Sequence, residues 1–107
     1  MARVVYSVCA TLPNEALAGA YVSWLLGAGA GDGHVGQVMA GGATEGTVWR
    51  EIGEGSIRVM SRYVFPGREA FDRYVREVAP GLRAEGLARF GALAGVSMER
   101  TVCEVVG

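Results

Sequence analysis

Residues 47–65, TVWREIGEGSIRVMSRYVF, decide the fold of this chain. Two runs that are rich in β-branched and aromatic residues, TVWREI (47–52) and SIRVMSRYVF (56–65), flank the turn sequence GEG (53–55). Strand-forming runs on either side of a glycine-rich turn predict a β-hairpin, and the PG pair at residues 66–67 ends it.

Side chains alternate along a strand, so the second run of the hairpin presents two different faces. One face carries Ile57, Val59, Tyr63 and Phe65. The other face carries Arg58, Met60, Arg62 and Val64. The first is the expected core face. The second is half apolar, and such a face favours cover by a partner.

Two further strands and several helical segments are expected around the hairpin. RVVYSVCAT (3–11) and VSMERTVCEVV (96–106) have strand-like composition. Helical periodicity is expected from Asn14, where the apolar stripe is Leu17, Ala20, Tyr21, Trp24 and Leu25. A short second piece is expected with Asp32 as its N-cap, and a third helix over residues 68–79 ends or kinks at Pro80.

The order β-α-β-β-α-β predicts an α+β fold of the ferredoxin-like type. In that fold a four-stranded antiparallel sheet carries its helices on one face. Because the other face is left bare and is partly apolar, we expect a homodimer in which two sheets pack face to face.

The length, composition and charge of the chain limit the classes of function that it can have. The chain of 107 residues has room for a single domain, residues 1–107. All its basic residues are arginine, which together with many glycine and alanine residues is typical of a GC-rich, bacterial genome. Ten basic against eleven acidic residues give no basic footprint for nucleic acid. No apolar run approaches the length of about 20 residues that a membrane span needs, and no signal-peptide pattern is present, so we expect a cytoplasmic protein.

SRYVFPGREAFDRYVREVAPGLRAEGLARFG (61–91) resembles the dimeric α/β-barrel superfamily, which includes antibiotic-biosynthesis and haem-degrading monooxygenases. The resemblance is carried by the aromatic strand, by the Y-x-x-x-x-A-P-x-L-R segment that starts at Tyr74, and by the EGLARFG tail. More closely, the chain is similar to a small bacterial domain family of unknown function in that superfamily. The insertion-like GAGAGD (27–32) departs from the family pattern. The resemblance implies a dimeric α/β barrel with a pocket between sheet and helices.

His34 is the only histidine of the chain and a candidate catalytic residue. At the positive start of a helix its imidazole favours the neutral form. A neutral ring can accept a proton, bind a hydroxyl or ligate iron. The alternative is a histidine that bridges the helix end and solvent.

Aromatic residues supply the other site candidates. Tyr63 is a candidate catalytic residue, with core packing as its alternative. Trp24, Tyr6 and Trp49 are candidate ligand-binding residues that would stack on a flat ligand. The helical spacing of Trp24 also fits core packing, and Trp49 can face either side of the hairpin.

Two arginines and two cysteines complete the candidates. Arg62 and Arg100 are expected at the dimer interface, paired with carboxylates across it. Cys9 and Cys103 are expected as buried, reduced thiols.

We predict no cofactor, and we predict no metal site because the spacing of possible ligands fits none. The formal G-x-G-x-x-G match GDGHVG (31–36) follows a helix rather than a strand, so a dinucleotide site is rejected.

Three functions stay open on the sequence alone. The first is binding of a small flat or apolar metabolite between sheet and helices, with cofactor-independent monooxygenase or cyclase chemistry at His34 and Tyr63. The second is a non-catalytic binding or assembly module without an open pocket. The third is haem binding through His34.

Overall fold

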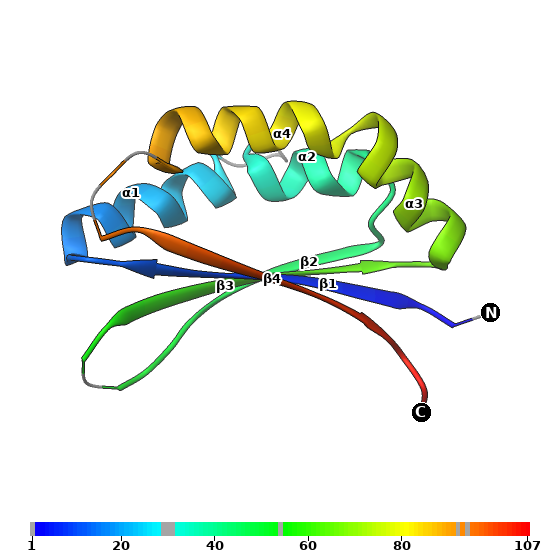
Figure 1. The fold of residues 1–107 in the computed structure, drawn as a ribbon, viewed down its shortest axis with the longest axis horizontal. Coiled ribbons are helices and arrows are strands. Elements are labelled where there is room, and N and C mark those ends of the chain that lie inside the picture. The colour runs from blue at the N-terminus through cyan, green and yellow to red at the C-terminus, as the bar shows by residue number, and fades with distance from the viewer. Residues whose placement is uncertain (1, 29–31, 54, 92, 94) are drawn as a thin grey trace.

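The computed structural model describes residues 2–28, 32–53, 55–91, 93 and 95–107. Figure 1 shows one sheet with all helices on the same side of it. The chain runs through β1 (Val4–Leu12), α1 (Glu15–Leu26), α2 (His34–Ala40), β2 (Glu45–Arg50), β3 (Ile57–Phe65), α3 (Arg68–Glu77), α4 (Ala79–Gly86), the π-helical turn η1 (Leu87–Gly91) and β4 (Ser97–Glu104). The predicted ferredoxin-like α+β fold is therefore confirmed, with more than one helix in each crossover.

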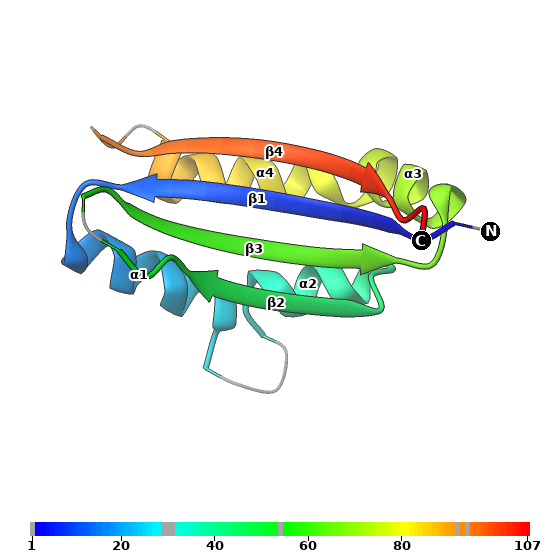
Figure 2. The same cartoon turned by 90° about the horizontal axis from the view of Figure 1, so that it is seen from below.

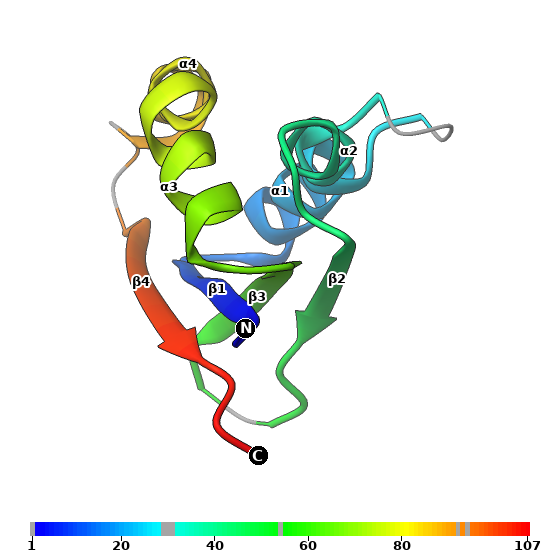
Figure 3. The same cartoon turned by 90° about the vertical axis from the view of Figure 1, so that its right-hand side faces the viewer.

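The sheet has the strand order β2-β3-β1-β4, and each neighbouring pair is antiparallel. β2 and β3 form the predicted hairpin; residue 54 of its turn lies outside the described residues. Figure 2 shows the sheet from below, where no helix covers it, and Figure 3 shows the helices above the opposite face. We call these the helix face and the free face of the sheet.

Strict alternation along β1 and β3 separates the two faces. The buried helix-face residues of β1 are Val4, Tyr6, Val8, Ala10 and Leu12. Those of β3 are Val59, Ser61, Tyr63 and Phe65. Every intervening residue of these two strands is at least partly exposed on the free face. The face that the sequence assigned to the core is confirmed.

The first crossover begins at a side-chain cap. Asn14 Oδ1 accepts a hydrogen bond from the Leu17 amide at 2.9 Å, and α1 then buries Ala18, Tyr21 and Leu25. Ala18 thus takes the place in the core that the expected stripe gave to Ala20, which is exposed.

The expectation that Asp32 caps the second helix was wrong. Its carboxylate accepts a hydrogen bond from the Ala28 amide at 2.8 Å. Asp32 therefore binds a residue that precedes it, just after the end of α1, and not an amide of α2. Gly33 is the N-cap of α2 and offers no side chain, so His34 becomes the first residue of that helix. Residues 29–31 of the insertion-like segment lie outside the described residues.

The second crossover is two helices joined at Val78. α3 buries Tyr74 and packs Phe71 and Val78 against the core. Pro80 lies in the first turn of α4, where its missing amide costs no hydrogen bond, so it opens a new helix rather than only ending the previous one.

The two cysteines are free thiols on the free face, in register with Met60 (Cys9) and Val5 (Cys103). Cys9 is half-buried and Cys103 is exposed, so the expectation of two buried thiols was wrong for Cys103 and only partly met at Cys9. None of the described helices has the length and apolar character needed to cross a membrane.

Gly46 allows α2 to lie close to β2. A Cβ atom at this position would come within 2.7 Å of Val35 Cγ1 and 3.4 Å of Met39 Sδ. Val35 is β-branched and has few alternative rotamers, so the helix itself would have to move.

We expect Gly46→Ala to lower the free energy of unfolding by about 1–3 kcal/mol, because the added methyl overpacks this contact. Urea denaturation measures the change. Gly19→Ala is the matched control: it adds the same methyl to α1, where nothing lies within 4 Å, and should leave stability equal or higher. Equal stabilities of the two variants would show that α2 does not rest on β2 at this point.

Candidate functional site

One row of residues crosses the middle of the helix face, where the strand registers align Val48, Ser61, Val8 and Arg100. Its members on the two middle strands, Ser61 and Val8, are small, whereas the next row on one side carries Tyr63 and Tyr6. A space is left between these small residues and the helices, and the two clusters of the hydrophobic core meet at this row.

The space is a hollow bounded by the sheet, α1, α2, α3 and α4. Its cavity volume is about 50 Å³, and the whole space free of protein atoms, with open solvent at the mouth included, is about 520 Å³. Among its lining residues, Arg83, Leu87, Gly91 and Arg100 are exposed. The hollow therefore opens between the α4–η1 segment and β4, which Figure 3 shows on the same side of the molecule.

Four buried hydroxyl-bearing residues line the hollow: Tyr6, Tyr21, Ser61 and Tyr74. Burial raises the pKa of Tyr21 and of Tyr74 to about 12 in each case, although Arg100 lowers both. These phenols are therefore protonated at neutral pH and act as neutral hydrogen-bonding groups, not as acids or bases.

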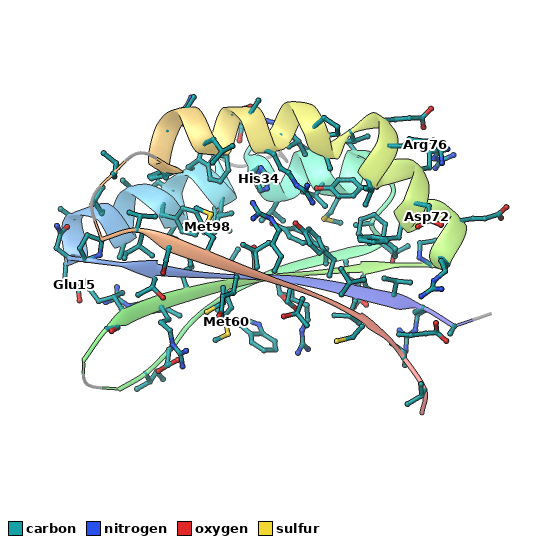
Figure 4. All side chains as sticks on the ribbon, viewed as in Figure 1. Glu15, His34, Met60, Asp72, Arg76 and Met98 are labelled. Carbon is teal, nitrogen blue, oxygen red and sulfur yellow. The ribbon has the colours of Figure 1, made fainter. Side chains whose placement is uncertain are left out.

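His34 and Trp24 form the wall of the hollow under α2 and α1. Their rings stack with centroids 4.3 Å apart and an interplanar angle of 23°. Trp24 Nε1 donates a hydrogen bond to Glu85 Oε1 on α4 at 3.3 Å, which fixes the indole. The structure thus brings the two predicted residues together across the insertion-like loop. Figure 4 shows His34 between the helices and the sheet, on the same side as Met98.

The environment of His34 favours a neutral imidazole. Burial lowers the pKa of His34, Glu85 raises it in part, and Arg100 lowers it further. At neutral pH the ring therefore keeps one nitrogen free to accept a proton or hydrogen bond. His34 is the one ionisable side chain lining the hollow that suits a base.

Tyr63 lies beside this hollow but does not line it. The side chain is fully buried, 6.0 Å from the Tyr6 ring and 6.5 Å from the His34 ring between centroids. Its hydroxyl makes no hydrogen bond within the described part of the chain. Burial raises its pKa strongly, and the nearby Ser61 hydroxyl, which lies outside hydrogen-bonding geometry, offsets only part of that rise.

Arg100 lies on the helix face, so its assignment to the dimer side of the sheet was wrong. β4 pairs Arg100 with Val8, which turns the arginine toward the hollow, and Arg100 lines it together with Arg83 of α4. The residues of β4 that face the free side are instead the alternate ones, such as Glu99 and Thr101.

Arg62 and Trp49 lie on the free face, away from the hollow. The Arg62 guanidinium stacks over the Trp49 ring, 4.4 Å from its centroid. Met60, the register partner of Trp49, projects from the same face in Figure 4. Of the three predicted ligand-binding residues, the structure therefore brings Trp24 and Tyr6 to the hollow and leaves Trp49 outside it.

The sequence reasoning missed Ser61, Tyr74 and Arg83 as lining residues. Two signals could have found them. The alternation that puts Val59 and Tyr63 on the core face also puts Ser61 there, and a polar residue among apolar ones marks a special position. Tyr74 and Arg83 are the first and last residues of the Y-x-x-x-x-A-P-x-L-R segment.

The residues present do not fit haem. A cavity of about 150 Å³ is what benzene fills, and a porphyrin is several times larger than the 50 Å³ enclosed here. One face of the His34 ring is also covered by Trp24, which limits the approach of a macrocycle. Among the residues that the structure describes, no three His, Cys, Asp or Glu side chains form a metal-binding group.

Solved structures share this fold over their whole length. Two dimeric ferredoxin-like proteins from uncultured marine organisms align with 100% of this chain: one at 16% identity, 98% of its own chain and a TM-score of 0.65, the other at 10%, 96% and 0.74. A Bacillus cereus protein provisionally named an antibiotic biosynthesis monooxygenase aligns over 100% of this chain and 96% of its own, at 14% identity and a TM-score of 0.68.

These identities are low, so the likeness shows the fold alone, and it agrees with the predicted ferredoxin-like fold. The chain matches no protein-family model and no curated protein sequence.

The depressed pKa of His34 predicts how stability changes with pH. Because the folded state resists protonation, the stability is complete above the unfolded pKa of about 6.5 and is lost as the pH falls through the lower folded pKa. We expect the single histidine Hε1 resonance in an NMR titration to report a pKa below 6.5. His34→Gln should remove the corresponding loss of unfolding free energy between about pH 7 and pH 5. A titration at or above the ordinary value would contradict the buried, neutral ring.

Proposed function

We propose that this chain forms a homodimer and that each subunit binds a small planar metabolite in the hollow between sheet and helices. The observation that carries the proposal is the stack of a neutral His34 on Trp24, in a lining that combines buried hydroxyls with apolar residues such as Leu82. Such a mixture of apolar surface and few convergent polar groups is characteristic of small-molecule sites.

The shape of the hollow limits the ligand. Its cavity volume of about 50 Å³ is below the usual range of ligand pockets and admits only a small part of a molecule, whereas the space of about 520 Å³ around it includes open solvent. A bound molecule would place a narrow or flat end beside Trp24 and extend through the mouth. Ring systems suit this geometry, because the flat faces of Trp24 and Tyr6 offer stacking surfaces without further ordering cost.

The proposed chemistry is a proton transfer. A ligand hydroxyl or activated methylene beside His34 would give its proton to the neutral imidazole, while the phenols of Tyr21 and Tyr74 donate hydrogen bonds to the anion that forms. Burial strengthens these hydrogen bonds because little water competes for them. This step is shared by cofactor-independent oxygenases and cyclases, the reaction class the sequence favoured.

Homodimerisation is supported by the composition of the free face. Val5, Cys9, Met60 and Val64 form its half-buried centre on the two middle strands. Two charged residues share this face: Arg62 lies between Met60 and Val64 on β3, and Glu99 lies on the edge strand β4 beside Cys9. Two of the structures with the same fold are described as dimeric proteins.

Ligand binding is testable through the two tryptophans, since Trp24 lines the hollow and Trp49 lies on the other face. In protein labelled with 5-fluorotryptophan, we expect 2-naphthol to shift the ¹⁹F resonance of Trp24 in a saturable way and to leave that of Trp49 unchanged. Trp49→Phe assigns the two resonances. Equal, non-saturating shifts of both lines would mean nonspecific contact, and no shift of Trp24 would favour a module whose pocket is closed by side chains.

The dimer is testable by charge insertion at the centre of the free face. We expect Met60→Asp to convert the dimer to a folded monomer in sedimentation equilibrium at micromolar concentration, because an unpaired carboxylate would be buried in the interface. Val75→Asp, a similar change at an exposed apolar residue of α3, is the control and should stay dimeric. A wild-type monomer, or a Met60→Asp dimer, rejects the face-to-face arrangement.

A further inference from the structure

We propose that the ligand carries an anionic group, a carboxylate or a group of similar charge, and that Arg83 and Arg100 bind it at the mouth of the hollow. This inference rests on the proposed function and adds the chemical class of the ligand. It assigns the flat end of the molecule to the interior and the charged end to the opening between α4 and β4.

The charge of the lining carries the first part of the argument. The chain as a whole has a formal charge of −1, with eleven acidic and ten basic residues. The described residues that line the hollow depart from this balance, because they include Arg83 and Arg100 and no carboxylate. A pocket of one sign of charge in a nearly neutral protein concentrates ligands of the opposite sign.

The two arginines are also available to a ligand. They come from different elements, α4 and β4, and both side chains are exposed where the hollow opens. Within the described residues neither of them forms an ion pair, whereas four other arginines do. The carboxylate nearest to this wall, Glu85, accepts a hydrogen bond from Trp24 and lies 3.8 Å from Arg89.

Their field reaches the interior of the hollow. Arg100 lowers the pKa of Tyr21, and Arg83 and Arg100 both lower the pKa of Tyr74, in each case by less than burial raises it. At His34, Glu85 raises the pKa by more than Arg100 lowers it, so the positive potential of the arginines acts at the two tyrosines. This potential stabilises negative charge on a group that lies beside these tyrosines. It would stabilise the anion left after proton transfer to His34 as well as a permanent carboxylate.

The chemistry of arginine fits a planar anion. A guanidinium presents a rigid fork of N–H donors that matches a carboxylate with two parallel hydrogen bonds. The cavity volume of about 50 Å³ takes only the edge of a flat ring, so the rest of a bound molecule lies in the open part of the hollow, toward the arginines. A flat aromatic acid would place its ring toward the interior of the hollow and its carboxylate beside the two arginines.

A matched pair of probes tests the inference: naphthalene-2-carboxylate and naphthalene-2-carboxamide, which share ring and shape and differ in charge. Binding is followed by the ¹⁹F resonance of Trp24 in fluorotryptophan-labelled protein. We expect the acid to bind about tenfold more tightly than the amide, since hydrogen bonds to charged groups exceed neutral ones by this order. The preference should shrink at high salt.

Variants assign the preference to the two residues. Arg100→Gln and Arg83→Gln should each reduce the affinity for the acid and leave that for the amide unchanged. Arg76→Gln, which changes an exposed arginine of α3 outside the hollow, is the control and should alter neither. Both test positions are exposed, so circular dichroism and thermal unfolding should match the wild type.

The outcomes separate this inference from the proposal it rests on. Equal affinities for acid and amide, with a saturable Trp24 shift, would overturn the anionic ligand and retain small-molecule binding. A preference for the acid that survives in the Arg83→Gln, Arg100→Gln double variant would overturn the assignment to these arginines. No Trp24 shift with either probe, or with benzoate and benzamide as smaller analogues, would overturn both proposals together.

Discussion

Alternation of side chains along β1 and β3 is the constraint on which the rest of this molecule depends. These two strands pair along their full length in the centre of the sheet, and every second residue of each is buried under the helices. A shift of the register by one residue would turn the aromatic side chains of both strands out to the free face. The helices, the hollow and the proposed interface all take their positions from this register.

The hollow lies over the row of the helix face that carries Ser61 and Val8, next to the row that carries Tyr63 and Tyr6. Ser61 and Val8 are shorter than these tyrosines, so the sheet fills less of the space below the helices at this row. Buried hydroxyls and a neutral imidazole line the hollow, and two arginines lie at its opening.

The sequence predicted the fold because the decisive signals are local. The hairpin, the caps and the helical stripes each depend on a few neighbouring residues, and the strand order follows from general rules of connection.

The sequence predicted less of the candidate site than of the fold. The face of Arg100 depends on the register between β4 and β1, which no local pattern contains. The error at Asp32 has a similar origin, since a carboxylate in a loop can bind an amide on either side and the chain uses the one at Ala28. His34 and Trp24 were recognised as candidates individually, but their contact depends on how a loop closes in space.

In β3, neighbouring residues serve different surfaces: Ser61 faces the hollow, while Met60 and Arg62 face away from it. The proposed ligand site and the proposed interface therefore fall on alternate codons of the same short segment. A substitution at one of these codons changes the side chains of one face and leaves those of the other unchanged, so the two surfaces can vary independently.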